Sequence, residues 1–421
     1  MCSNAATYGS RKRSSRSSPE RAVGKARSVR TRLPLRTQQV FDLAVLSNFL
    51  AIGVLLAAVP LHVKEDLGGS KAAVGVATTI FFAAALVARP IAGRVMDRIG
   101  RRPFLVWPLV AMVVLAIAME GTDSVLLVVI VRLLQGAFGS VFYTACAAVA
   151  TDLAPADKRA GAVARLSLMI YLGFAFGPFI GEWLFGRDNR WPWVAAAVLH
   201  GLALLAARHL PETLKVASQA TVSAASTLRT YRSVALPGMA QLCAGLGYSC
   251  VVAFLTLYAR EIGLGQAGWL FFTYACSALA VRMVSGRLAD RFGYVAVALP
   301  GMVVFGCGHM LMAVAWAPWV PFPAITMLGI GFGAVFPALT ALAVSDAPDA
   351  DRGAALGTFL SFNDLGNAVA GPAVGAIADA AGFRWAYGAP AIVALVGVGF
   401  VAALARRARR VASDAAAPAL R

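Results

Sequence analysis

The chain has 421 residues, of which 59% are hydrophobic and only 14% are charged. Soluble proteins carry roughly 25% charged residues, so this composition excludes an ordinary soluble globular protein. The 38 lysine and arginine residues outnumber the 20 acidic residues and give a net charge of +18. In a soluble protein that surplus would favour nucleic acid, but in a membrane protein its position along the chain decides its meaning.

Twelve apolar segments follow one another along the chain, each long enough to cross about 30 Å of hydrocarbon as a helix. None shows the alternating pattern of a barrel strand. The predicted spans are 40–62, 72–92, 104–120, 124–150, 160–185, 192–208, 234–259, 266–286, 294–315, 319–345, 354–378 and 386–405. We therefore predict an all-α integral membrane protein with twelve transmembrane helices.

The spans fall into two groups of six, which predicts two domains. We expect a six-helix bundle at 38–208 and a second one at 234–405, joined by a cytoplasmic linker at 209–233. The segment 1–37 is rich in serine and arginine and lacks the apolar core of a cleavable signal peptide, so we predict a disordered basic tail there. Residues 406–421 form a second basic tail.

The basic residues are divided unevenly between the two sides of the predicted membrane. With an even number of spans both termini lie on one side, and 28 of the 38 basic residues fall in tails and loops of that side, against six in the opposite loops. An excess of lysine and arginine marks the cytoplasmic side. We therefore predict a multi-pass protein of the cell membrane with both termini cytoplasmic, in contact with the lipid bilayer and without a nucleic-acid partner.

Motifs of enzymes and metal proteins do not occur in the sequence. The six cysteines lie far apart and form no CxxC pair, which indicates neither a disulfide framework nor a metal site. There is no phosphate-binding loop of the G-x-x-x-x-G-K-[ST] type. We expect a protein that is not an enzyme, has no cofactor or obligatory protein partner, and is driven by an ion gradient or by the gradient of its substrate.

A loop between the second and third spans of the first half recurs in the second half. The repeat pairs AGRVMDRIG at 92–100 with SGRLADRFG at 285–293, an offset of 193 residues. The same offset relates Arg89 to Arg282. A repeat of this length indicates two duplicated, pseudo-symmetric bundles related by an axis along the membrane normal.

On these residues the chain resembles the major facilitator superfamily from 38 to 405, and in particular its twelve-helix drug:proton antiporters. The resemblance implies the major facilitator fold and a conformational latch, in which Asp97 and nearby arginines tie the bundles together on the cytoplasmic side in the outward-open state, near Gly353. The signature loop comprises Gly93, Arg94, Asp97, Arg98, Gly100, Arg101 and Arg102, and its second copy contributes Gly286, Asp290 and Arg291. The alternative is a purely structural loop of tight turns and a carboxylate cap.

Two further elements resemble antiporters of the same superfamily. Arg132 with Gln135 and Gly136 is similar to an RxxQG signature of proton-coupled exporters. The residues Gly173, Gly177, Pro178 and Gly181 are similar to a GxxxGPxxGG element, repeated in the second half by Gly371, Pro372 and Gly375. Glu182 stands where the last glycine is expected. We interpret these elements as kinks that mark the interface at which the bundles rock. The alternative is simple close packing of membrane helices.

Two ionisable residues inside spans are candidates for proton coupling. Asp364 is the only acid near the middle of a span, and a medium of low dielectric favours the neutral carboxyl group, which suits a proton carrier. Its alternative role is a structural hydrogen bond through Asn363 or Asn367. Arg132 lies about eight residues inside a span and would hold an acid or a substrate oxygen, unless it bonds backbone carbonyls or extends to the interface.

The resemblance and these residues together predict a secondary active transporter that exports hydrophobic or amphiphilic small molecules, such as drugs or antibiotics, in exchange for protons. Alternatives are an exporter or importer of a polar metabolite such as a sugar, and a transporter-like membrane sensor or scaffold without net transport. The candidate substrate-binding residues are Asn48, Tyr143, Tyr171, Tyr248, Asn363 and Asn367. Alternating exposure of one central site is the expected mechanism.

Overall fold

Helices make up nearly all of the described chain. The computed structural model describes residues 35–155, 158–214, 224–345, 347 and 352–416. Within them the long α-helices, in chain order, are α1 (Leu35–Leu61), α2 (Lys71–Ile99), α3 (Arg102–Ala118), α4 (Val125–Leu153), α5 (Arg159–Phe185), α6 (Trp191–Ala207), α7 (Ala224–Glu261), α8 (Gly268–Phe292), α9 (Tyr294–Ala313), α10 (Pro321–Ser345), α11 (Arg352–Ala381) and α12 (Phe383–Ala416). The predicted all-α fold of twelve helices is confirmed.

Ten helices of the described chain are long and apolar enough to cross a membrane, by length and composition. The helix α6 is apolar but only 17 residues long. The helix α11 carries three polar residues in one stretch, Asn363, Asp364 and Asn367. A helix satisfies its own backbone groups, so it is one of the two structures that can span hydrocarbon.

The repeated loop ends two corresponding helices in the same way. Gly100 follows α2 with φ of 119°, and Gly293 follows α8 with φ of 88°. A side chain is strained at such angles, so glycine lets the chain turn sharply into the next helix. At the start of α2, the Ser70 hydroxyl accepts a hydrogen bond from the N–H of Ala73 at 3.1 Å. This is the usual way of satisfying a free helix-start donor.

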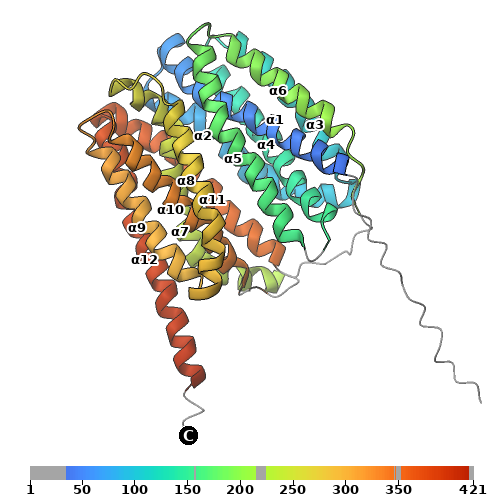
Figure 1. The fold of residues 1–421 in the computed structure, drawn as a ribbon, viewed down its shortest axis with the longest axis vertical. Coiled ribbons are helices and arrows are strands. Elements are labelled where there is room, and N and C mark those ends of the chain that lie inside the picture. The colour runs from blue at the N-terminus through green and yellow to red at the C-terminus, as the bar shows by residue number, and fades with distance from the viewer. Residues whose placement is uncertain (1–34, 156–157, 215–223, 346, 348–351, 417–421) are drawn as a thin grey trace, which may run out of the picture.

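The helices form two bundles with the same packing scheme. In the first, α1 packs on α5 and α6, α2 on α4, and α3 on α4 and α6; in the second, α7 packs on α11 and α12, α8 on α10, and α9 on α10 and α12. Figure 1 shows the blue to green helices α1 to α6 grouped beside the yellow to red helices α7 to α12. The bundles meet chiefly through α2 against α11 and α5 against α8.

Glycines allow the close helix contacts. Gly75 of α2 and Gly371 of α11 face each other across the bundle interface, and a Cβ on either would overlap the other backbone. A Cβ at Gly375 would lie 2.6 Å from Cα of Ala72, also across the interface. The glycines of α5 pack differently, since Gly177 lies against α1 of its own bundle. The antiporter-type element of α11 therefore lies at the bundle interface, whereas the glycines of α5 pack within one bundle.

Some boundaries differ from those predicted. The helix α7 begins at Ala224, inside the predicted linker 209–233, and α12 continues to Ala416, inside the predicted tail 406–421. The helices α2 and α8 run six or more residues beyond their predicted ends at 92 and 286. Hydropathy misses such extensions because helix propensity continues where the apolar run stops. The predicted N-terminal tail lies outside the described residues, apart from the start of α1.

Candidate functional site

A cavity of about 180 Å³ lies between the bundles. Its wall is mainly aromatic and comes from both halves, with Phe82, Tyr143, Tyr171, Phe174, Tyr248, Phe271, Tyr274, Phe332 and Phe336. The polar members are Arg89, Ser167, Arg282, Asn363, Asp364 and Asn367. A second cavity of about 170 Å³ shares part of this wall and extends to Arg132 of α4. An apolar pocket with a few convergent polar groups is the usual form of a small-molecule site.

An ion pair joins the bundles at the wall of this cavity. Nη1 of Arg89 on α2 lies 3.0 Å from Oδ2 of Asp364 on α11. The Asp364 side chain is 2% exposed and that of Arg89 is 20% exposed. The guanidinium also lies over the ring of Tyr143, 5.3 Å from its centroid. Asp364 therefore lies at the cavity, as expected of a proton carrier. Its ion-pair partner is an arginine of the other bundle.

A second arginine joins the bundles on the other side of the cavity. Nη1 of Arg282 on α8 donates a hydrogen bond to the Tyr171 hydroxyl on α5 at 2.8 Å. The guanidinium lies 5.4 Å from the centroid of the Tyr171 ring and 5.8 Å from that of Phe336. Each of the two main bundle contacts thus has one arginine at the cavity.

The amide side chains of α11 are held by α7. Asn363 accepts a hydrogen bond from Nε2 of Gln241 at 2.9 Å and donates one to Asp364 at 3.3 Å. Asn367 accepts one from the Ser249 hydroxyl at 3.0 Å. Of the predicted substrate-binding residues, Tyr143, Tyr171, Tyr248, Asn363 and Asn367 line the cavity. The asparagines orient α11 and Asp364 as well as facing the cavity.

Asn48 lies away from the cavities. It is fully buried in α1, and its Oδ1 lies 3.1 Å from Nδ1 of His200 on α6. It is not among the residues that line either cavity. The structure thus places Asn48 in a polar contact inside the first bundle, and the predicted substrate role has no geometric support.

Arg132 is bound within its own bundle. Its guanidinium donates to the Gln135 side chain at 3.0 Å and to the carbonyls of Ala77 and Thr78 at 3.4 Å. The side chain is almost completely buried and lies 5.2 Å from the Phe81 ring centroid. These neutral acceptors fit the alternative role, in which Arg132 bonds backbone carbonyls. It still forms part of the wall of the second cavity.

Carboxylates cap helix starts across the interface at one end of the molecule. We call this the loop end; it carries η1 (His62–Asp66) and the loops 186–190 and 262–267. Asp379 near the end of α11 accepts from the N–H groups of Lys71 and Ala72 at the start of α2, both at 2.8 Å. Glu182 of α5 accepts from the N–H of Gly268 at the start of α8, at 2.9 Å. A carboxylate at a helix start is stabilised by free N–H donors and the helix dipole.

Ion pairs add to the contacts at the loop end. Arg260 at the end of α7 pairs with Glu65 of η1, and Nζ of Lys71 lies 3.4 Å from Glu261. Exposed pairs of this kind contribute about 0–1 kcal/mol each. Together with the two caps they tie α2, α5 and η1 of the first bundle to α7, α8 and α11 of the second. The loop end is therefore closed.

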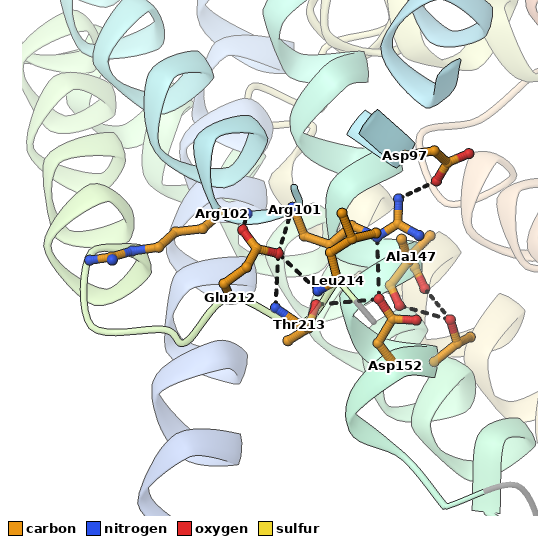
Figure 2. Close-up of polar contacts among 10 residues, drawn as sticks. Asp97, Arg101, Arg102, Ala147, Asp152, Glu212, Thr213 and Leu214 are labelled. Carbon is orange, nitrogen blue, oxygen red and sulfur yellow. Dashed lines mark hydrogen bonds and ion pairs between the residues drawn. The ribbon is translucent and has the colours of Figure 1, made fainter. Parts of the chain in front are cut away.

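The signature loop lies at the opposite end, which carries the start of α1 and the end of α12; we call it the terminal end. Asp97 contacts Arg101 of its own loop at 2.5 Å, and Nε of Arg101 lies 3.2 Å from Asp152 of α4 (Figure 2). Around Gly353 of α11, no atom of the described residues outside the helix lies within 4 Å of where a Cβ would stand. In this conformation Asp97 therefore contacts its own bundle rather than the start of α11.

Glu212, which sequence analysis did not single out, caps the start of α3. Its carboxylate accepts from the backbone N–H groups of Arg101 at 2.8 Å and Arg102 at 3.0 Å, and from those of Thr213 and Leu214 at 2.9 Å (Figure 2). Desolvation acts to raise the pKa of this carboxyl, but the four donors outweigh it and hold the pKa below its usual value. Glu212 thus fastens the segment after α6 to the signature loop.

The second copy of the loop makes fewer contacts. Asp290 and Arg291 lie at the end of α8, and the Arg291 guanidinium stacks 5.1 Å from the neighbouring Phe292 ring. Gly286 has open space where a Cβ would stand, as far as the described residues show. The second copy also lacks the basic pair, because Tyr294 and Val295 follow Gly293 where Arg101 and Arg102 follow Gly100. The two copies of the loop are therefore asymmetric.

The sequence analysis did not predict that Arg89 and Arg282 belong to the site. Their partners there are Asp364 and Tyr171. The predicted spans ended at 92 and 286, which put both arginines near helix ends. Because α2 and α8 continue to Ile99 and Phe292, both side chains lie well inside their helices. The internal repeat could have identified both arginines, because it places a charged residue at equivalent positions inside the membrane in both halves. A charge at such a depth is unfavourable and therefore indicates a function.

Two bundles with equivalent packing around one aromatic cavity, tied at one end, define a membrane transporter rather than an enzyme. The chain belongs to the Major Facilitator Superfamily, whose family model matches residues 41–258 and 237–420. The predicted family is confirmed.

Relatives and solved structures agree with this family. The chain is 28% identical to an uncharacterized MFS-type transporter of Pseudomonas aeruginosa, over 86% of this chain and 92% of the relative. It is 27% identical to the uncharacterized MFS-type transporter YhhS of Escherichia coli, over 80% and 84%. A variant of the nucleoside transporter NupG superposes with a TM-score of 0.74 at 14% identity, over 87% of this chain and 99% of that one. The human organic anion transporter MFSD10 superposes with a TM-score of 0.67 at 18% identity, over 88% and 100%. At these identities the two solved structures show the fold alone.

Proposed function

We propose that this chain is a proton-coupled transporter of the cell membrane, with both termini cytoplasmic, that exports hydrophobic or amphiphilic small molecules by alternating access. The observation that carries the proposal is the Arg89–Asp364 pair, which joins the bundles at the cavity. An ionisable pair at this depth is costly and marks a proton or substrate pathway. The aromatic wall of the cavity supports a substrate with a large apolar part.

The pair links protonation to bundle movement. It exists only while Asp364 is ionised and while α2 lies against α11. A proton on Asp364 cancels the charge that attracts Arg89 and so weakens the tie between the bundles. Rocking of the bundles in turn separates Arg89 from the carboxylate and favours uptake of a proton. Each step biases the other, which is the requirement for coupled transport.

The experiment uses purified protein in proteoliposomes with a preset pH gradient. Addition of an amphiphilic substrate should dissipate the gradient in the wild type. Asp364→Asn should abolish this dissipation and leave membrane insertion intact, because the amide keeps the shape but neither binds nor releases a proton in the working range. Wild-type coupling in this variant would refute the role of Asp364.

A matched control is available in the first bundle. Asp42 of α1 is also buried and ion-paired, with Nε of Arg165 on α5 at 2.6 Å, but both partners belong to one bundle. Asp42→Asn should therefore retain proton coupling. Binding of substrate without any flux in the wild type would instead favour a sensor, and flux without proton movement would favour an uncoupled carrier.

A further inference from the structure

The two arginines related by the internal repeat have different partners. Arg89 pairs with a carboxylate, that of Asp364, at 3.0 Å. Arg282 donates to a phenol, that of Tyr171, at 2.8 Å. Tyr171 precedes Asp364 by 193 residues, the same offset that separates the arginines. The two contacts therefore occupy equivalent positions in the two halves of the fold. The partner of the arginine is an acid, Asp364, in one contact and a neutral hydroxyl, that of Tyr171, in the other.

The rings beside the two arginines correspond as well. Arg89 lies 5.3 Å from the ring centroid of Tyr143, and Arg282 lies 5.8 Å from that of Phe336. These rings again stand 193 residues apart. Three pairs of positions therefore correspond between the two halves. The Arg89–Asp364 pair shows how the charge of an arginine at this position of the repeat is neutralised by a carboxylate.

The charge of Arg282 is not neutralised by a carboxylate of the described residues. Among the described residues no carboxylate oxygen lies within 4.0 Å of it, and the Tyr171 hydroxyl carries no charge to offset the guanidinium. Arg132, at the second cavity, also bonds only neutral groups. The charged residues lining the two cavities are thus three arginines and Asp364. Arg282 is half-buried, and a cation partly withdrawn from water without a counter-charge is unfavourable.

We propose that the transported molecule supplies the missing counter-charge, so that the cavity binds organic anions, with a carboxylate, sulfonate or phosphate group at Arg282. The guanidinium has donors left beyond the one used on Tyr171, and its planar fork suits an oxyanion. This inference rests on the proposed transport function and narrows its substrate class.

The rest of the cavity fits the body of such a molecule. Tyr248 and Phe332 stack with ring centroids 4.8 Å apart in the wall, and Phe174 and Phe271 add further apolar surface. Aromatic rings favour flat apolar groups packed against them. The expected substrate is therefore an amphiphilic anion whose apolar or aromatic part lies among the rings while its acidic group contacts Arg282.

The test compares three probes with one aromatic body: naphthalene-2-sulfonate, the neutral naphthalene-2-sulfonamide and the cationic 2-naphthylmethyl-trimethylammonium. Binding to the purified full-length protein is measured by calorimetry, and flux in proteoliposomes. The wild type should bind the sulfonate on the order of tenfold more tightly than the sulfonamide, because a charged hydrogen bond is stronger than a neutral one. The cation should bind most weakly.

Four variants test whether the preference for the sulfonate over the sulfonamide depends on Arg282. Arg282→Gln should bind the sulfonate and the sulfonamide alike, whereas Arg282→Lys should keep a reduced preference for the sulfonate. Tyr171→Asp places an internal carboxylate beside Arg282, as Asp364 stands beside Arg89, and should abolish the sulfonate preference. Tyr171→Phe removes the same hydroxyl without adding charge, so its preference for the sulfonate should exceed that of Tyr171→Asp. Retained binding of the neutral sulfonamide shows that a variant is folded.

The outcomes separate this inference from the proposed function. Equal or stronger binding of the neutral or cationic probe by the wild type, or a sulfonate preference that survives Arg282→Gln, overturns the anion site. Proton-coupled flux of the cationic probe would overturn the anion site and leave the exporter standing. Sulfonate binding lost in Arg282→Gln, without proton-coupled flux in the wild type, would support the anion site and refute the exporter.

Discussion

The two ends of the molecule are held differently. At the loop end, Asp379 and Glu182 cap helix starts of the opposite bundle, and glycines bring α2 and α11 into backbone contact. At the terminal end, Asp97 contacts its own loop, and no atom of the described residues outside α11 lies within 4 Å of where a Cβ would stand at Gly353 or Gly357. The polar contacts between the bundles lie between the Arg89–Asp364 pair and the loop end.

The signature loop has a different role in each conformation of the bundles. Because these polar contacts tie the bundles together at the loop end, we infer that the cavity opens toward the terminal end. In this state the signature loop stiffens the first bundle by joining α2, α4 and the start of α3. We infer that contact between Asp97 and α11 belongs to the opposite conformation, in which the loop end is open.

The largest expected effect comes from preventing closure of the loop end. Gly371→Leu puts a side chain where the α2 backbone now lies. Overpacking of this kind costs about 1–3 kcal/mol, and here the cost falls on the closed state alone. Transport should fall by about ten- to a hundredfold, measured as initial flux in proteoliposomes.

Ala373→Leu is the matched control for that substitution. Ala373 lies two residues further along α11, and its side chain is exposed. This variant should transport within a factor of about two of the wild type, because surface changes usually cost under 0.5 kcal/mol. Equal loss in both variants would show that α11 tolerates no added volume and would contradict the role of loop-end closure.

A smaller effect is expected from removing one cap. Asp379→Ala leaves the N–H groups of Lys71 and Ala72 without their acceptor, which costs about 0.5–2 kcal/mol for a helix cap. The loop end should open more often, seen as faster labelling of a cysteine introduced at Ser167 in the cavity wall by a reagent added from that side. Asp123→Ala is the control. Asp123 is an exposed acid between α3 and α4, and this loop lies at the loop end because α3 begins at the terminal end. Equal labelling in the two variants would contradict the role of the cap.

Asp97→Asn should have a smaller effect still. Its exposed ion pair with Arg101 contributes about 0.2–1 kcal/mol, and the same carboxylate is the expected latch of the opposite state. Turnover should slow up to about fivefold with little change in substrate affinity. An unaltered turnover number would discard the latch.

The smallest effect concerns pH and the cap at Glu212. Because folding lowers the pKa of this carboxyl, its contribution to stability is complete above the ordinary carboxyl range and is lost as the pH falls through the folded pKa. The wild type should therefore melt at a slightly higher temperature than Glu212→Gln at pH 7. The difference should vanish in acid, and a difference independent of pH would exclude this cause.

The sequence was sufficient for the fold because the fold depends on features that are local along the chain. Twelve apolar runs and the 193-residue repeat predict twelve helices in two bundles without any knowledge of contacts. The glycines at 100 and 293 likewise follow from the loop, since each ends a helix at a positive φ.

The site was only partly predictable because it depends on which side of each helix faces the cavity. Asp364 was found from its depth, but its partner Arg89 comes from a helix 275 residues away in sequence. Asn48 was predicted as a substrate-binding residue and lies outside the walls of both cavities, since α1 is largely apolar and its sequence does not indicate which face lies toward the cavity. Glu212 escaped notice because an exposed acid in a polar stretch has no distinctive pattern.

The most direct test of the account follows both ends at once by electron-spin distance measurements. Spin labels at Asn189 and Ala317 report the loop end, and labels at Lys158 and Tyr294 report the terminal end, in a background without native cysteines. On acidification the loop-end distances should lengthen while the terminal-end distances shorten, and Asp364→Asn should show the acidic distribution at every pH. Distances that change in the same direction at both ends, or an Asp364→Asn variant that still responds to pH as the wild type does, would contradict alternating access controlled by this carboxylate.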